Sequence, residues 1–315
     1  MGAQISERAT MVAMSSNKST AAKRSLQALG VVSAVGAGVL AYSMVEAKSY
    51  RLRDVQVPVL EPGAEPLRVL HLSDLHMTPR QAGKAEWIQQ LAQLQPDLVV
   101  ATGDFMAHPD AVYPITAALG PLLDVPGLFV FGSNDYYAPK IGNPFTYFAG
   151  PTNFDRGEPN LPWQELRSAL SSGGWIDLSN RRDHVKVNGR LIDVRGVDDP
   201  HINRDQYEPI AGPFDPTADL ALGVAHAPYL RVLDAMADDG AQLIMAGHTH
   251  GGQVCIPGYG ALVTNCDLDT ARVKGLNHHK DAWLHVSAGL GTNPITPVRL
   301  ACPPEATLLT LVGRE

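Results

Sequence analysis

Five short apolar segments of this 315-residue chain are each followed at once by side chains that can bind a metal ion. The segments are residues 67–72, 98–102, 128–131, 220–224 and 243–246, and the motifs after them are Asp74-Leu75-His76, Gly103-Asp104, Gly132-Ser133-Asn134, His226 and Gly247-His248-Thr249-His250. Each segment has the length and composition of a buried strand. Because ligands of open α/β sheets bind beyond the carboxyl ends of strands, the pattern predicts one site built from several strand ends.

The remaining patterns predict an α/β fold with mixed sheets. Helical segments are expected at residues 85–94 and near 111–119, and strands that alternate with helices indicate a mostly parallel, buried sheet. Asn188-Gly189 separates two apolar runs, residues 185–187 and 191–194, and this dipeptide is typical of a tight hairpin. Residues 136–160 are rich in Pro, Gly, Asn and aromatic residues, so we expect a long loop beside the site.

The N-terminal region contains a hydrophobic segment at residues 26–45, and roughly 20 helical residues suffice to cross a bilayer. A membrane anchor is the leading interpretation. A cleaved signal peptide is the alternative, because Val45-Glu46-Ala47 resembles a small-residue cleavage site. Basic residues on both sides leave the orientation open. We expect a membrane-associated protein with a tail at residues 1–49 and a folded domain at 50–315.

The charge and cysteine content exclude some classes of protein. A formal net charge of −7 argues against broad nucleic-acid binding, which usually requires a basic surface. A phosphate-bearing substrate would therefore need a local positive field. The 3 cysteines have no C-x-x-C spacing, so neither a disulfide framework nor a thiolate zinc site is indicated.

Two residues apart in an extended segment, Asp74 and His76 would project to the same face and could hold one ion together. Oxygen and imidazole ligands without thiolate suit Mn, Fe, Zn or Mg, and the ligand types alone do not choose among these metals.

The ordered series D-x-H, G-D, G-x-N, a lone H and G-H-x-H resembles the ligand motifs of the calcineurin-like metallophosphoesterase superfamily. The resemblance implies a four-layer α/β/β/α sandwich of two mixed β-sheets flanked by helices. It also implies two divalent metal ions and hydrolysis of a phosphate ester by a metal-bridging hydroxide. The implied ligands are Asp74, His76 and His250 for the first ion and Asn134, His226 and His248 for the second, with Asp104 bridging both.

One position departs from the family pattern. Many members have a histidine directly after the asparagine ligand, where this chain has Asp135, so Asp135 and His201 are both candidates for the acid that protonates the leaving group. If neither serves, substrates with good leaving groups should be preferred. Arg299 is a candidate for binding a substrate phosphate or for a surface salt bridge, and His71 for a packed or hydrogen-bonded position in the first strand.

Membrane-anchored members of the superfamily resemble this layout, and some similar proteins hydrolyse the pyrophosphate of UDP-diacylglucosamine. By this analogy we expect a phosphodiester or pyrophosphate substrate near the membrane, either a small molecule or lipid-linked. The alternatives within enzymes are a cyclic-nucleotide phosphodiesterase and a phosphoprotein phosphatase. From other classes, a non-catalytic metal-binding scaffold and a metal-storing or metal-sensing protein are the competing hypotheses.

Overall fold

The structure, a computed structural model of the chain, describes residues 26–139, 157–292 and 295–315. The chain divides into two compact units, Met1–Val45 and Glu46–Glu315. The described part of the first unit lies within one helix, Leu26–Glu46, whose 21 residues are long and apolar enough to cross a membrane, as those of some signal sequences also are.

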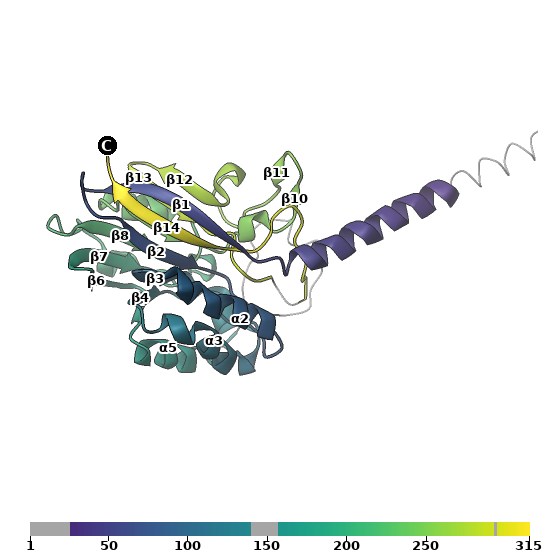
Figure 1. Cartoon of the computed structure of the whole chain (residues 1–315), viewed down its shortest axis with the longest axis horizontal. Helices are drawn as coiled ribbons and strands as arrows, with labels where there is room; N and C mark the ends of the chain where they lie inside the picture. The colour runs from purple at the N-terminus through teal and green to yellow at the C-terminus, as the bar shows by residue number, and fades with distance from the viewer. Residues whose placement is uncertain (1–25, 140–156, 293–294) are drawn as a thin grey trace, which may run out of the picture. The chain divides into compact units, whose positions relative to one another are not determined.

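The second unit contains two six-stranded sheets (Figure 1). In spatial order the first sheet consists of β1 (Arg51–Leu60), β14 (Glu305–Gly313), β2 (Leu67–Leu72), β3 (Leu98–Ala101), β4 (Gly127–Phe129) and β5 (Ile176–Asp177). The second consists of β12 (Gly275–His279), β13 (Ala282–Val286), β9 (Leu243–Ala246), β8 (Leu220–Val224), β7 (Arg190–Gly196) and β6 (Arg181–Val187). A separate short pair is formed by β10 (Cys255–Ile256) and β11 (Gly260–Ala261).

Both sheets are mixed. In the first, β2 to β5 are parallel, whereas β14 is antiparallel to β2. In the second, β7, β8, β9 and β13 are parallel, and the edge strands β6 and β12 are antiparallel to their neighbours. Strands that are parallel neighbours end at the same edge of the sheet, which is where the predicted ligands follow them.

Helices cover the outer faces of the sheets. The α-helices of this unit are α2 (Ala82–Gln90), α3 (Val112–Leu119), α4 (Ser133–Tyr136), α5 (Trp163–Ser172) and α6 (Leu230–Asp238). Shorter 3₁₀ helices are Leu91–Leu94, Pro109–Ala111, Gly120–Leu122, Pro200–Ile202, Glu208–Ile210, His250–Gly252 and Thr270–Arg272. The helices pack on the sheets because each has an apolar face. Helix α6, for example, packs Val232, Leu233 and Met236 against the second sheet, and its polar residues face outward.

Three apolar layers hold this arrangement together. The middle layer packs side chains of the first sheet, such as Val69 and Val100, against side chains of the second, such as Leu222 and Met245. One outer layer lies between the first sheet and α2, α3 and α5, and the other between the second sheet and α6. The predicted four-layer α/β/β/α sandwich is confirmed.

The local predictions also agree with the structure. Residues 85–94 fall within α2 and the 3₁₀ helix that continues it, and the segment expected near residues 111–119 corresponds to α3, which begins at Val112. Strands β6 and β7 form the expected hairpin, with Asn188 and Gly189 at φ of 51° and 82°. Positive φ at both positions is what a type I′ turn requires.

Two glycines should respond oppositely to alanine. Gly189→Ala places a Cβ at a φ of +82° and should destabilise the domain by roughly 1 kcal/mol. Gly83→Ala lies in α2, where a Cβ has open space around it, and should stabilise by about 0.5 kcal/mol. The measurement is the urea midpoint of unfolding. Two shifts of the same sign would contradict the assigned backbone conformations.

Candidate metal centre

The seven predicted ligands all follow the carboxyl ends of strands. In the first sheet, Asp74 and His76 follow β2, Asp104 follows β3 and Asn134 lies in α4 after β4; in the second, His226 follows β8, and His248 and His250 follow β9. Strands β2, β3 and β4 are parallel neighbours, as are β8 and β9. The candidate ligands are therefore contributed by both sheets at the edge where their strands end.

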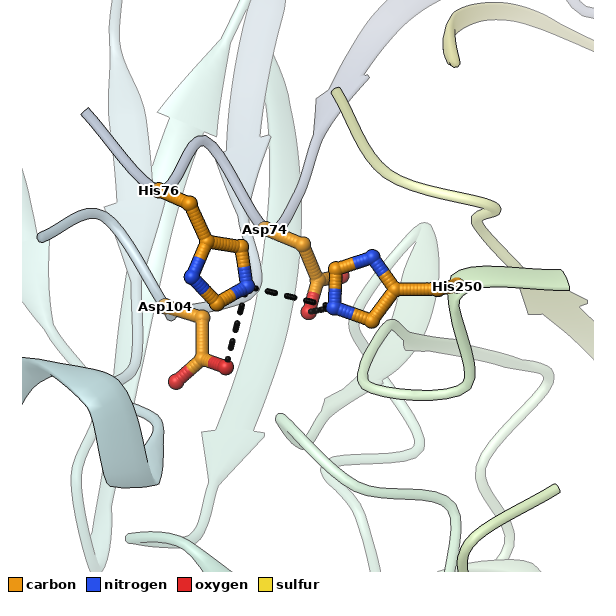
Figure 2. Close-up of side chains that lie close together, drawn as sticks. All are labelled: Asp74, His76, Asp104 and His250. Atoms are coloured by element: carbon orange, nitrogen blue, oxygen red, sulfur yellow. Dashed lines mark hydrogen bonds and ion pairs between the residues drawn. The ribbon is translucent and has the colours of Figure 1, made fainter. Parts of the chain in front are cut away.

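Four of these side chains form a compact cluster: Asp74 and His76 from the turn after β2, Asp104 from the turn after β3 and His250 from the turn after β9. Figure 2 shows them converging. One ligand atom of each lies within 4.8 Å of the others. His76 Nε2 is 3.1 Å from His250 Nε2 and 3.5 Å from Asp104 Oδ2. His250 Nε2 is 3.5 Å from Asp74 Oδ1. Two carboxylates and two imidazoles thus face one point.

The other three predicted ligands adjoin the same cluster through Asp104. His226 Nε2 lies 3.6 Å from Asp104 Oδ2, and His248 Nδ1 lies 3.3 Å from His226 Nε2. Asn134 donates its side-chain N–H to Asp104 Oδ2 at 2.7 Å and its backbone N–H to Asp104 Oδ1 at 2.7 Å. The structure therefore brings all seven residues together, with Asp104 in contact with both groups.

The cluster has the donor chemistry that a divalent cation needs. Asp74 Oδ1 is buried and has no hydrogen-bond partner among the described residues, and the same holds for His76 Nδ1. A buried carboxylate oxygen without a partner is costly, and a bound cation would compensate it. Oxygen and imidazole donors without thiolate suit Mn, Fe, Zn or Mg. A divalent metal ion fits these residues.

Five of the seven candidate ligands have left-handed backbones. They are Asp74 (φ 50°), His76 (43°), Asp104 (54°), His248 (68°) and His250 (50°). Strand β2 ends at Leu72, so the prediction that an extended segment projects Asp74 and His76 together is wrong. A curled turn brings them together instead. Left-handed conformations cost L-residues roughly 1–2 kcal/mol each, and such strain is often found at functional sites.

Backbone hydrogen bonds hold this turn against its neighbour. The N–H of Asp74 donates to Gly103 O at 2.9 Å, and the N–H of His76 donates to Asp104 O at 2.9 Å. The parallel pairing of β2 and β3 thus continues past the ends of both strands, so the two turns that carry Asp74, His76 and Asp104 are fixed to each other.

Asp135 fastens the turns after β3 and β4. Its Oδ1 accepts the N–H groups of Phe105 at 2.8 Å and Met106 at 3.0 Å. Its Oδ2 accepts those of Asp104 at 2.8 Å and Gly132 at 2.9 Å. The side chain is completely buried. Because each oxygen already accepts two bonds, the geometry favours a structural role for Asp135 over that of a leaving-group acid.

Two glycines allow the ligands to approach closely. A Cβ on Gly132 would lie 2.7 Å from His226 Nε2 and would also overlap Asp104 Oδ1. A Cβ on Gly103, which has a φ of +84°, would lie 2.9 Å from His226 Nδ1. The G-D and G-x-N motifs therefore need glycine for a steric reason, since His226 of the second sheet inserts between the two turns of the first.

Burial sets most of the imidazoles in their neutral, ligand-competent form. It lowers the pKa of His76 to about 4 and the pKa values of His248 and His250 well below the usual range. His226 differs, because the charges of Asp104 and other carboxylates outweigh burial and raise its pKa to about 9. In turn His226 and His76 hold the pKa of Asp104 low despite its burial.

A buried chain of hydrogen bonds orients Asp74. His285 Nδ1 contacts His71 Nδ1 at 2.8 Å, and His71 Nε2 contacts the Thr102 hydroxyl at 3.0 Å. The hydroxyls of Thr102 and Ser73 continue the chain to Asp74 Oδ2, with the last bond at 2.5 Å. His71 is hydrogen-bonded within β2 as predicted, and its contact with β13 ties the two sheets together beneath the cluster.

Arg299 orients the imidazole ring of His250. Its side chain is fully buried and donates to the carbonyls of Ala288 and Gly291 at 2.7 Å and to His250 Nδ1 at 3.2 Å. Both earlier hypotheses for Arg299, a surface salt bridge and a phosphate ligand, are wrong because the guanidinium has no access to solvent or substrate. It fixes the ring of the candidate ligand instead.

His201 lies beside the second group of candidate ligands. It is mostly buried, its Nδ1 is 3.0 Å from the Tyr229 hydroxyl, and its ring centroid is 4.3 Å from that of His248. Asp199, which sequence analysis did not single out, accepts the His201 N–H at 2.8 Å, while its buried Oδ2 has no partner among the described residues. Asp199 follows the end of strand β7, as the candidate ligands follow the ends of other strands, and this position is the sequence signal that could have identified it.

The expected loop at residues 136–160 is described only in part, since 140–156 lie outside the described residues. At its start, Tyr136 is fully buried and donates its hydroxyl to both oxygens of Asp198, at 2.8 and 2.9 Å. This tyrosine therefore belongs to the core and does not line the mouth of the site.

Comparison with known proteins gives a consistent result. Residues 67–252 match the family described as calcineurin-like phosphoesterases. The protein YpbG of Bacillus subtilis is 27% identical over 93% of this chain and 100% of its own length. The metallophosphoesterase YkoQ of the same species is 28% identical over 78% of this chain and 84% of its own. The phosphodiesterase YaeI of Escherichia coli is 25% identical over 92% of this chain and 98% of its own length.

The raised pKa of His226 predicts proton release on metal binding. At neutral pH its imidazole carries a proton that a cation must displace, so affinity for Mn²⁺ should rise with pH up to about 9. Calorimetric titration in two buffers with different ionisation heats measures the released proton. The control His184→Ala changes an exposed histidine and should leave the release intact, whereas His226→Ala should remove it. An affinity that does not change over this pH range contradicts the prediction.

Proposed function

Because the chain belongs to the calcineurin-like phosphoesterase family and is thus a hydrolase of phosphoester bonds, we propose that it is a dinuclear phosphodiesterase or pyrophosphatase acting near a membrane. The name of the YaeI relative, a phosphodiesterase, supports a diester over a monoester. The remaining support comes from the candidate centre.

The position of Asp104 is the observation on which this proposal rests. One oxygen, Oδ2, lies 3.5 Å from His76 Nε2 and 3.6 Å from His226 Nε2, and these imidazoles belong to the two different groups of candidate ligands. A carboxylate between two sets of nitrogen donors is suited to bridge two cations. A site for a single ion would not need the second set.

We assign the ligands accordingly. Asp74, His76 and His250 would hold one ion, Asn134, His226 and His248 the other, and Asp104 both. Two bound divalent ions would supply Lewis-acid chemistry, which activates water and stabilises charge on phosphoryl oxygens.

Charge at the site favours a phosphate substrate. Two divalent ions carry four positive charges, and only two are balanced by the carboxylates of Asp74 and Asp104. This local excess would attract a phosphate anion although the whole chain has a net charge of −7.

Removal of the bridging carboxylate tests the dinuclear centre. We expect Asp104→Ala to lower hydrolysis of bis-(p-nitrophenyl) phosphate by at least about a hundredfold, since even residues around metal ligands cost 10- to 100-fold. Bound metal, counted by mass spectrometry, should fall in the same sample. The matched control is Asp110→Ala, whose side chain is 82% exposed. Full metal content together with full activity in Asp104→Ala would refute the assignment.

The leaving-group acid is a separate question. Asp135 has both oxygens engaged with backbone N–H groups, whereas His201 presents an imidazole beside His248. We therefore assign the proton-donating role to His201, with the Tyr229 hydroxyl orienting its ring through Nδ1. Asp135 would act only by positioning the turns.

A series of aryl phosphodiesters with leaving groups of increasing pKa distinguishes the two residues. His201→Ala should slow esters of poor leaving groups about 100-fold or more and p-nitrophenyl esters much less, because a good leaving group needs no proton. Asp135→Asn should slow all esters equally and lower the unfolding midpoint. If His201→Ala also slows every ester by the same factor, His201 is not the acid.

The N-terminal helix is proposed to be a retained membrane anchor. The Glu46 side chain is 6% exposed and its Oε2 accepts the N–H of Ala301 at 2.8 Å. Signal cleavage after Ala47 would remove this residue from the folded domain. The integration of Glu46 into the domain therefore favours a retained segment over a cleaved one.

A further inference from the structure

A short hairpin beside the candidate centre exposes apolar side chains. It comprises residues 253–266, which include β10 and β11. Outside the N-terminal helix, the described residues include five exposed large apolar side chains, and three of them belong to this hairpin: Ile256, Tyr259 and Leu262, which are 48%, 76% and 42% exposed. Single exposed apolar residues are ordinary, but a concentration of them indicates a contact surface.

The hairpin also lacks charge. From residue 253 to residue 266 the sequence contains no Asp, Glu, Lys or Arg. A charged residue would have to be desolvated on contact with an apolar phase, whereas tyrosine suits the boundary between water and hydrocarbon. Pro257 and Gly258 at the tip are exposed as well, so a polar surface does not interrupt the apolar one.

The hairpin forms one border of the candidate centre. The 3₁₀ helix His250–Gly252 leads directly into β10, and a Cβ on Gly252 would overlap Ala261 of β11. After β11 the chain returns to the site, where the carbonyl of Asn265 lies 3.2 Å from His248 Nε2. Whatever binds the hairpin is therefore held close to His248 and His250.

The hairpin is also close to the point where the hydrophobic helix joins the domain. Glu46, the last residue of that helix, accepts the Ala301 N–H at 2.8 Å. The preceding residue, Leu300, pairs with Val254 and accepts the N–H of Cys255 at 2.8 Å. The end of the helix is therefore linked to strand β10 by two hydrogen bonds, one from Ala301 to Glu46 and one from Cys255 to Leu300.

We propose that the β10–β11 hairpin docks on the surface of the lipid bilayer and turns the metal centre toward substrates carried in that bilayer. This inference rests on the membrane anchoring proposed above. A helix that leaves the bilayer at Glu46 would keep the adjacent hairpin at the lipid surface, and the hairpin has the uncharged, apolar residues that such a surface binds. The substrate class is then a phosphodiester or pyrophosphate with a lipid tail.

Tryptophan fluorescence in lipid vesicles tests the docking. The full chain with Tyr259→Trp is reconstituted into phosphatidylcholine vesicles with or without brominated acyl chains, which quench tryptophan on contact. We expect the emission gained over the parent protein to be blue-shifted and quenched by the brominated lipid. The control is Tyr113→Trp on α3, which is 80% exposed and lies apart from the hairpin in Figure 1, and whose added emission should stay unquenched.

The outcomes separate this inference from the proposed function. The docking is overturned, but not the anchor, if the chain floats with the vesicles and the emission added by Tyr259→Trp shows neither a blue shift nor quenching. A chain that does not float overturns both. Hydrolysis of soluble bis-(p-nitrophenyl) phosphate is measured on the same samples, and its loss with quenching retained would contradict the phosphodiesterase while supporting the docking.

Discussion

The apolar layer between the two sheets is the constraint on which the candidate centre depends. Asp74, His76, Asp104 and Asn134 belong to the first sheet, and His226, His248 and His250 to the second, so no single sheet can form the cluster. Side chains such as Val100 and Met245 set the distance between the sheets. Because interiors are close-packed and respond to the loss of even one methylene, a change in this layer should be transmitted to the ligands.

Hydrogen bonds around the strand ends stabilise the strained backbone of the candidate ligands. Five candidate ligands adopt left-handed conformations, each unfavourable for an L-residue. The three of them that belong to the first sheet, Asp74, His76 and Asp104, persist because Asp135 accepts four backbone N–H groups and because β2 and β3 stay paired beyond their ends. The positions of these donors are thus set by the protein's own hydrogen bonds. The same logic explains why an aspartate, with two acceptor oxygens, is useful after Asn134.

Much of the fold and the candidate ligand set could be predicted from the sequence, because both are encoded locally. Apolar runs that end in Asp, Asn or His mark the strand ends, and Asn188-Gly189 marks a hairpin. The left-handed turns could not be predicted, since Asp74 and His76 also fit an extended strand. The contact between His71 and His285 joins residues 214 positions apart, and Arg299 is buried by contacts with residues up to 49 positions away, so neither is encoded locally. Asp199 was missed because a polar pair after a strand is a weak signal when no family motif includes it.

The charge distribution gives a physical reason for taking a substrate from a membrane. A soluble anion would meet the field of a chain with a net charge of −7 before it reached any cations held at the candidate centre, and such repulsion slows association. A substrate held in the bilayer would already be concentrated in the plane of the proposed anchor. Its approach would then depend on apolar contact with the β10–β11 hairpin, which has no charged residue from position 253 to position 266, and the field of bound cations would be needed only close to the candidate centre. An acidic protein with an uncharged hairpin at one border of its proposed cation site is suited to that route.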